Sequence, residues 1–165
     1  MEMDHMNITV DKVYEWLSGV KDPEIPVLSL VDLGVITNVS VDERKVTVEM
    51  TPTFVGCPAL EQMQQEVREV IEQHGASSVT VNISFKKPWS SDLITENGRA
   101  ALKSFGIAPP QGRQLFADLG MLEHPACPRC GGTDTEIRNL FGPTLCRSIH
   151  YCHHCHEAFE QFKSL

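Results

Sequence analysis

Two pairs of cysteines within residues 127–155 constrain the fold of this chain more than any other feature of its sequence. Each pair has the spacing C-x2-C, and 21 residues separate the pairs, which are Cys127 with Cys130 and Cys152 with Cys155. A two-residue spacing lets one tight turn aim two thiolates at one ion, and the two glycines after Cys130 permit the positive φ that such a turn needs. Two such turns supply the tetrahedral set of four sulfur ligands that structural zinc prefers. The sequence therefore predicts a zinc site with these four ligands.

A closed set of four thiolates leaves no open position for a catalytic water, so we expect the zinc to be structural. Iron is the alternative metal for the same geometry. A redox role is less favoured, because neither C-x2-C pair opens a helix after a strand. The spare cysteine, Cys146, is predicted to be a buried strand residue. An alternative is that a nearby histidine replaces one of the cysteine ligands. Because four cysteines already have the right spacing, we expect the histidines to be solvated or packed instead: His150, His153, His154 and His156.

The cysteines belong to a predicted second domain, residues 126–165, which is too small to fold on a hydrophobic core alone. Strands are expected at residues 135–140, 145–151 and 158–162, which together predict a small all-β zinc ribbon. Four basic and four acidic residues balance its charge. Because it lacks the basic excess of a ribbon that binds nucleic acid, protein docking is the better interpretation.

The preceding residues, 1–108, predict an α/β domain. Helices are expected at residues 10–17, 58–74 and 95–105, and strands at 35–41, 46–50 and 79–85. This order, α-β-β-α-β-α, favours one small mixed sheet with covering helices. Residues 109–125 contain three prolines and two glycines and are expected to form a linker, in which residues 115–122 are apolar enough for one docked helical turn.

Charge and hydropathy exclude two classes of partner. The chain has 22 acidic and 14 basic residues, which argues against nucleic acid, whose binding relies on lysine and arginine. No apolar run approaches the ~18 residues of a membrane span, and the first residues lack the pattern of a secretory signal. We therefore expect no membrane contact and a cytoplasmic location in which the thiols stay reduced.

A sixth cysteine, Cys57, lies at the predicted start of the second helix, where Pro58 suits the first helical position. A thiol there faces the positive end of the helix dipole, so we expect a lowered pKa. The carboxylates of Asp22 and Glu24 lie in a proline-rich loop that could face the same place. The alternative is a small packed residue at the helix start. One thiol cannot hold an iron–sulfur cluster by itself, so iron would be handled transiently, with mixed ligands, or across a homodimer.

The sequence carries no recognisable catalytic site. It has no G-x-G-x-x-G motif and no phosphate-binding loop, and its one Glu-x-x-His, Glu2 to His5, stands alone where a di-iron bundle needs two. The histidine nearest to Cys57 on the second helix, His74, lies at the far end of that helix, too distant to activate the thiol. These absences argue against a di-iron oxygenase, a dinucleotide-dependent enzyme and a nucleotide hydrolase, and an independent thiol enzyme is the less favoured interpretation.

Several short blocks resemble a known family. Residues 22–26 (DPEIP), 32–35 (DLGV), 51–53 (TPT) and 56–58 (GCP) resemble the SufT-like iron–sulfur assembly domain, over roughly residues 9–86. This resemblance implies an iron-handling site that comprises Asp22, Glu24, Thr51, Thr53 and Cys57.

Further blocks, residues 88–90 (PWS), 98–99, 102–110 and 141–144 (FGPT) with the four-cysteine ribbon, extend the resemblance to the whole chain. They resemble the family of D subunits (also called J) of phenylacetyl-CoA epoxidase systems, which act in aerobic bacterial phenylacetate breakdown. This resemblance implies an auxiliary subunit whose partners are the oxygenase and reductase subunits, and which matures an iron–sulfur or di-iron centre of one of them. The alternative is a structural adaptor that docks oxygenase and reductase. Cys57 distinguishes the two, because an adaptor has no chemical need for a thiol at a helix start.

Overall fold

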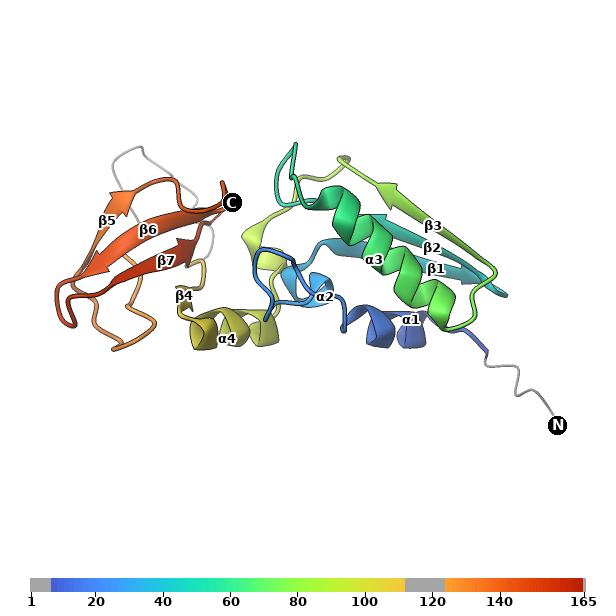
Figure 1. Ribbon diagram of the computed structural model, residues 1–165, viewed down its shortest axis with the longest axis horizontal. Coiled ribbons are helices and arrows are strands. Elements are labelled where there is room, and N and C mark those ends of the chain that lie inside the picture. The colour runs from blue at the N-terminus through green and yellow to red at the C-terminus, as the bar shows by residue number, and fades with distance from the viewer. Residues whose placement is uncertain (1–6, 112–123, 165) are drawn as a thin grey trace. The chain divides into compact units, whose positions relative to one another are not determined.

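The computed structural model describes residues 7–111 and 124–164. The chain divides into two compact units, Met1–Trp89 and Ser90–Leu165, which are coloured blue to yellow-green and yellow to red in Figure 1. The helical turn predicted within residues 115–122 lies outside the described residues, as does most of the predicted linker. In the part of the chain that is described, no helix has the length and apolar character needed to cross a membrane.

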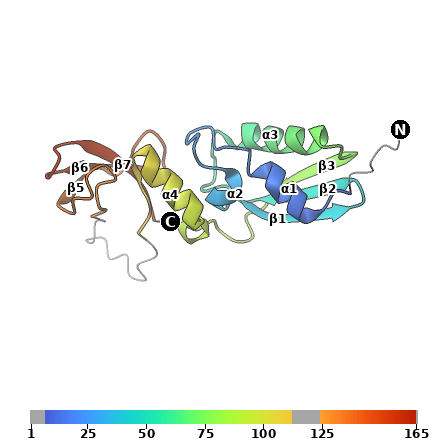
Figure 2. The ribbon, with the colours of Figure 1, turned by 90° about the horizontal axis from the view of Figure 1, so that it is seen from below.

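The first unit is built on a mixed three-stranded sheet with the strand order β1-β2-β3. Strands β1 (Ile36–Asp42) and β2 (Lys45–Met50) form an antiparallel hairpin, and β3 (Ser78–Ile83) runs parallel to β2. Helices α1 (Val10–Leu17) and α3 (Leu60–Gln73) cover one face of this sheet (Figures 1 and 2). The predicted mixed sheet with covering helices is therefore confirmed.

Alternation along the strands separates an apolar face from a polar one. Val39, Val48 and Val81 lie side by side in the register of the sheet and are all buried. Between them, Thr47 of β2 and Thr80 of β3 point to the opposite face, which the helices leave uncovered. The helices complete the core with side chains spaced at helical periodicity: Val13, Leu17, Met63, Val67 and Ile71.

Three local features of the first unit differ from the prediction. A short helix, α2 (Leu30–Leu33), precedes β1; its cap is Ser29, whose Oγ accepts from the Asp32 amide at 3.0 Å. Helix α3 begins at Leu60 and not at Pro58, because the residues after Cys57 first form a turn. Strand β3 ends at Ile83, two residues before the predicted end.

The second unit contains a four-stranded sheet with the order β4-β7-β6-β5. Strands β5 (Thr135–Asn139), β6 (Arg147–Cys152) and β7 (Ala158–Phe162) form an antiparallel meander, which confirms the predicted β-ribbon. A two-residue strand, β4 (Ile107–Ala108), pairs with β7 in parallel. Before it come the short helix η1 (Ser91–Leu93) and helix α4 (Glu96–Phe105), whose cap is Thr95.

Strand β4 explains why the observed boundary differs from the predicted one. We expected residues 90–108 to belong to the first domain, but the second unit begins at Ser90. Pairing of β4 with β7 joins the segment to the ribbon, and Arg99 of α4 donates hydrogen bonds to Pro110 O at 2.7 Å and Ser91 O at 3.1 Å. The pairing of β4 with β7 joins residues that are distant in the sequence, so no local sequence pattern predicts it.

Candidate functional site

The four predicted zinc ligands come together in the second unit. The Sγ atoms of Cys127, Cys130, Cys152 and Cys155 all lie within 4.8 Å of one another. Cys127 and Cys155 are 3.7 Å apart at sulfur, and Cys130 and Cys152 are 3.6 Å apart. A tetrahedron with zinc–sulfur bonds of about 2.3 Å has sulfur–sulfur edges of about 3.8 Å. The spacing and the chemistry of these donors therefore fit a closed structural zinc site.

Two turns of the same backbone form present these thiols. The amide of Gly131 donates to Cys127 O at 2.9 Å, and the amide of His156 donates to Cys152 O at the same distance. Both donors have positive φ, 74° for Gly131 and 58° for His156. The sequence predicted this conformation after the first pair of cysteines but not after the second, where His156 occupies the position equivalent to the glycine.

Gly132 stands directly against the sulfur cluster. Its amide faces Cys130 Sγ at 3.3 Å, and its carbonyl accepts from the Cys127 amide at 2.9 Å. A Cβ on Gly132 would lie 2.9 Å from His154 Cβ and 3.2 Å from Cys130 Sγ. A glycine is therefore required here for space, whereas at Gly131, with nothing within 4 Å, it is required for conformation.

The electrostatics of the thiols favour a bound cation. Backbone N–H groups of Cys155 and His154 lower the pKa of Cys152 to about 7. Burial, together with the neighbouring thiols, raises the pKa of Cys155 to about 12. Four thiolates at this spacing repel one another, so full ionisation requires a positive ion between them. When bound, zinc would supply that charge and cross-link the two turns, with no open position for catalysis.

The histidines of the ribbon are not part of this ligand group. Among the described residues, the four cysteines form the group that could hold a metal ion. His150 is buried, and its Nε2 lies 2.9 Å from Ser148 Oγ, while His153 and His154 are exposed. Cys146 is buried as expected, although it precedes β6 and does not lie in it.

Cys57 lies on the loop between β2 and α3, in the first unit, and its side chain is half-buried. Burial raises the pKa of the thiol, the Ala59 amide opposes this, and the carboxylates of Asp22 and Glu24 raise the pKa further. Our prediction of a lowered pKa is therefore wrong. The helix begins three residues after Cys57, and desolvation with two nearby negative charges outweighs the backbone donors.

The loop that carries Asp22 and Glu24 is held closed. Its ends meet in a bridge between Lys21 and Ser29. One oxygen of Asp22 accepts from the amides of Glu24 at 2.7 Å and Ile25 at 3.0 Å, so this carboxylate also shapes the loop. The structure thus brings Asp22 and Glu24 within electrostatic range of Cys57, as the sequence suggested.

Thr51 and Thr53, the other residues of the implied site, belong to the Cys57 loop itself. Thr51 directly follows β2, its amide donates to Val35 O at 2.8 Å, and its side chain is buried. Thr53 is half-buried. Their positions make Thr51 a support of the loop base, whereas the carboxylates come from a separate segment of the fold.

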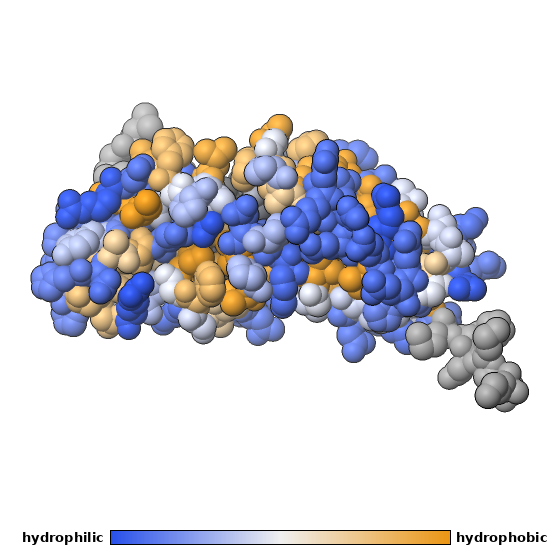
Figure 3. Space-filling view, viewed as in Figure 1, coloured by the Kyte–Doolittle hydropathy of each residue, from blue (hydrophilic) through white to orange (hydrophobic). Residues whose placement is uncertain are grey.

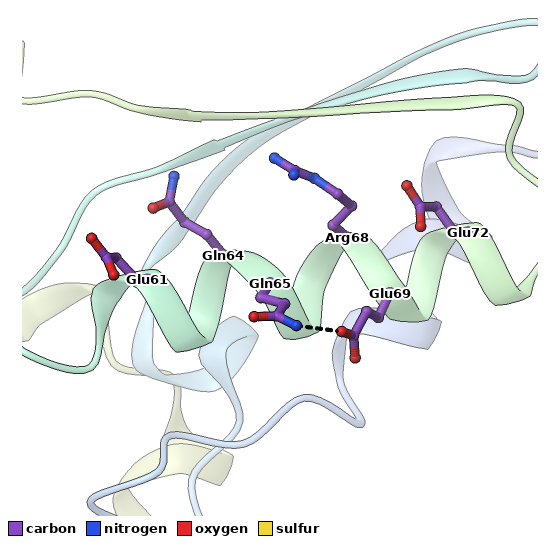
Figure 4. A pocket seen from close by; sticks show the side chains of 6 residues that line it. All are labelled: Glu61, Gln64, Gln65, Arg68, Glu69 and Glu72. Carbon is purple, nitrogen blue, oxygen red and sulfur yellow. Dashed lines mark hydrogen bonds between the residues drawn. The ribbon is translucent and has the colours of Figure 1, made fainter.

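A hollow on the surface of α3 is distinct from both groups. Six side chains of α3 line it (Figure 4): Glu61, Gln64, Gln65, Arg68, Glu69 and Glu72. Gln65 Nε2 donates to Glu69 Oε1 at 2.7 Å, within the helix. The surface around this helix is mostly hydrophilic in Figure 3. The hollow holds no nucleophile, and we interpret it as a solvated helix face.

Two family models each match one part of the chain, and one known protein matches nearly all of it. Residues 10–83 match the family model described as iron–sulfur cluster assembly protein, and residues 113–163 match the PaaD zinc beta ribbon domain. Two solved structures share the fold of the first part. A domain of unknown function from Bacillus anthracis is 30% identical, with a TM-score of 0.53 over 56% of this chain and 89% of that one. A conserved hypothetical protein from Thermotoga maritima is 27% identical, with a TM-score of 0.51 over 61% and 97%.

Among curated proteins, an Fe–S protein maturation auxiliary factor of Porphyromonas gingivalis is 36% identical over 57% of this chain and 90% of its own length. The maturation factor SufT of Staphylococcus aureus is also 36% identical, over 50% and 96%. The protein named as the D subunit of 1,2-phenylacetyl-CoA epoxidase in Escherichia coli is 35% identical over 94% of this chain and 93% of its own. The chain therefore belongs to the family of phenylacetyl-CoA epoxidase D subunits, in which an iron–sulfur assembly domain precedes a zinc ribbon.

Proposed function

We propose that this protein is a non-catalytic auxiliary factor that helps to assemble the iron–sulfur or di-iron centre of a partner in phenylacetyl-CoA epoxidation. The observation that carries the proposal is the match of residues 10–83 to the iron–sulfur cluster assembly family, together with the carboxylates of Asp22 and Glu24 in electrostatic range of the Cys57 thiol. Similarity to two maturation factors, over 57% and 50% of the chain, supports it.

Iron is the cargo in this proposal and not a resident cofactor. A thiolate with oxygen ligands suits a borderline metal ion such as ferrous iron. A stable iron–sulfur cluster takes about four thiolates, and Cys57 is the cysteine that the first unit contributes. The cargo would therefore be held transiently and passed on. Thr51 and Thr53 would shape the loop that presents the thiol.

The partners we propose are the oxygenase and reductase subunits of the epoxidase. The relative that covers 94% of this chain bears the name of a subunit of that system. The zinc ribbon would dock the client while the first unit delivers its cargo. Zinc then has a structural role, because its four thiolate ligands leave no position for a substrate.

An adaptor that holds oxygenase and reductase together is the alternative. One observation favours it: the loop between β5 and β6 exposes three large apolar side chains, Leu140, Phe141 and Leu145, with exposed fractions of 55%, 59% and 57%. Exposed apolar groups gathered on one loop are typical of protein-binding surfaces. This loop serves either function, so only the need for Cys57 separates them.

The deciding experiment measures the metal content of the epoxidase. Its components would be isolated from cells that contain wild-type protein, a Cys57→Ala variant, a Val55→Ala control on the same loop, or no copy of this chain. If the protein is a maturation factor, the client from Cys57→Ala cells should contain as little iron and sulfide as the client from cells that lack this protein. The client from Val55→Ala cells should have normal contents, because Val55 is 81% exposed and offers no metal ligand.

A second measurement uses purified, metal-replete oxygenase and reductase. A maturation factor acts before turnover, so its addition should leave kcat unchanged. If epoxidation instead requires this protein at one-to-one stoichiometry, and Cys57→Ala restores it as well as wild type, the adaptor replaces the maturation factor as the function.

A further inference from the structure

Among the residues that the structure describes, no strand pairs with the outer edge of β3 in the first sheet. Strand β3 pairs with β2 on one side and is the last strand in the order β1-β2-β3 (Figure 1). Its six residues, SVTVNI, include no charge and no proline, and its register with β2 runs without a bulge. Ser78, Thr80 and Asn82 are exposed, and Phe85, just beyond the strand, is 55% exposed. Proteins normally block such edges with charges, prolines or bulges, so an open edge marks a pairing surface.

The opposite edge of the same sheet is protected. Strand β1 has an irregular register between Ile36 and Asn38, which bends the edge, and it carries the charge of Asp42. The Thr37 hydroxyl donates to Glu49 O at 3.2 Å. The two edges of this sheet therefore differ: β1 has features that disfavour pairing with another strand, and β3 lacks them.

We propose that β3 pairs with β3 of a second copy of this chain, antiparallel and centred on Val81. In this register the two Val81 residues lie opposite each other, and Val79 of each copy lies opposite Ile83 of the other. Opposed residues of an antiparallel pair share a face, so apolar side chains meet apolar ones on the helix-covered side. Val79 and Ile83 are half-buried in the single chain, and this pairing would complete their burial.

Charge complementarity also favours a second copy. Lys86 and Lys87 follow β3 and are exposed, while Glu72 stands exposed in the last turn of α3, just before the strand begins. Antiparallel pairing brings the carboxyl end of one β3 to the amino end of the other. The lysines of each copy then approach the acidic end of α3 of its partner.

The assembly closes on itself. An isologous β3–β3 junction gives one six-stranded sheet whose outer edges are both β1, the protected strand. Cys57 follows the carboxyl end of β2, which runs parallel to β3, so the two thiols lie at opposite ends of the joint sheet. This dimer therefore does not share one iron centre between copies, and the inference is independent of the proposed function.

Sedimentation of the full chain over a range of concentrations, with zinc bound, tests the proposal. Wild type should be a dimer that dissociates on dilution. Thr80→Lys places two lysines as diagonal neighbours about 7–8 Å apart across the junction and should weaken the dimer by at least about tenfold. The matched control is Thr47→Lys on β2, directly in register with Thr80 and on the same face but away from the edge; it should remain dimeric.

Hydrogen exchange locates the interface. The amides of β3 should gain protection as wild-type concentration rises, and those of Thr80→Lys should not. A wild-type chain that is monomeric throughout would overturn the proposal, as would a dimer that Thr80→Lys leaves intact. Protection of β3 in a monomeric chain only after epoxidase components are added would assign the edge to another protein and equally reject the second copy.

Discussion

At Cys57, burial and two carboxylates oppose the backbone donors at the start of α3. Burial is the largest influence on the pKa of the thiol, and the Ala59 amide is the largest one that opposes it. The carboxylates of Asp22 and Glu24 then act in the same direction as burial. The raised pKa keeps the thiol mainly protonated near neutral pH, and because the thiolate is the reactive form, this slows its alkylation and oxidation.

The first prediction concerns the reactivity of this thiol. Cys57 should be alkylated more slowly near neutral pH than a free cysteine, because its pKa is raised and only the thiolate attacks. Glu24→Gln removes one negative charge, lowers the pKa and should accelerate alkylation. Glu43→Gln, in the β1–β2 turn, is the control and should change nothing. The measurement is alkylation rate against pH in zinc-loaded protein, and a Cys57 faster than a free cysteine would refute this account.

The second prediction separates two adjacent glycines. Gly131→Ala should cost about 1 kcal/mol of ribbon stability, because φ is 74° there while space is open. Gly132→Ala should cost more and weaken metal retention, because its Cβ would press on His154 and Cys130 Sγ. Zinc release to a chelator, followed with a colorimetric dye, compares them. Equal release from both variants would contradict the steric argument.

At the scale of elements, caps and turns decide where helices begin. Thr9 and Thr95 cap α1 and α4, and their hydroxyls accept from amides three residues later at 3.3 and 3.0 Å. Helix α2 is only four residues long and depends on the buried Ser29, whose hydroxyl also donates to Asp32 Oδ2 at 2.8 Å. So short a helix has little internal stability and relies on its cap.

The third prediction tests that cap. Ser29→Ala should lower the free energy of unfolding of the first unit by about 1–2 kcal/mol, because it leaves the Asp32 amide without its acceptor. Ser18→Ala, at the exposed end of α1, should shift it by less than about 0.5 kcal/mol. Urea unfolding followed by tryptophan fluorescence is suited to this, since Trp16 and Trp89 are the two tryptophans and both lie in the first unit. Similar losses in both variants would show that the cap is not what holds α2.

At the scale of the whole molecule, two units with different sources of stability share one chain. The first has a conventional core in which two helices cover an apolar sheet face. In the second, two of the cysteines, Cys127 and Cys152, belong to the buried cluster with Ala108 and Phe159. Removal of zinc would leave two buried thiols, those of Cys127 and Cys152, without a metal partner inside that small core.

The fourth prediction follows from this difference. A chelator strong enough to remove zinc should abolish exchange protection in β6 and β7, because the free energy of metal binding is part of the folding free energy of the ribbon. Tryptophan fluorescence, which reports the first unit, should stay native. Cys127→Ser should behave like the chelated protein. If the chelator abolished both the exchange protection of the ribbon and the native tryptophan fluorescence, the two units would not be independent in stability. A ribbon that kept its exchange protection without metal would also contradict the prediction.

Local patterns in the sequence were sufficient for the zinc ligands and for most elements. The spacing of Cys127 and Cys130 acts within one turn, the cap at Thr95 acts within one helical turn, and strand alternation separates two faces without reference to any partner. The proximity of Cys57 to Asp22 and Glu24 was only suggested, since Cys57 lies more than thirty positions from both carboxylates in the sequence.

Tertiary structure decided what depends on distant segments. The direction of the Cys57 pKa shift follows from burial and from carboxylates on another loop, and these outweigh the local helix start from which the opposite sign was predicted. Pairing of β4 with β7 moved residues 90–108 into the second unit. The open edge at β3 exists only because the strand order is β1-β2-β3. Burial, electrostatic environment and strand neighbours arise when remote parts of the chain meet, and no local pattern encodes them.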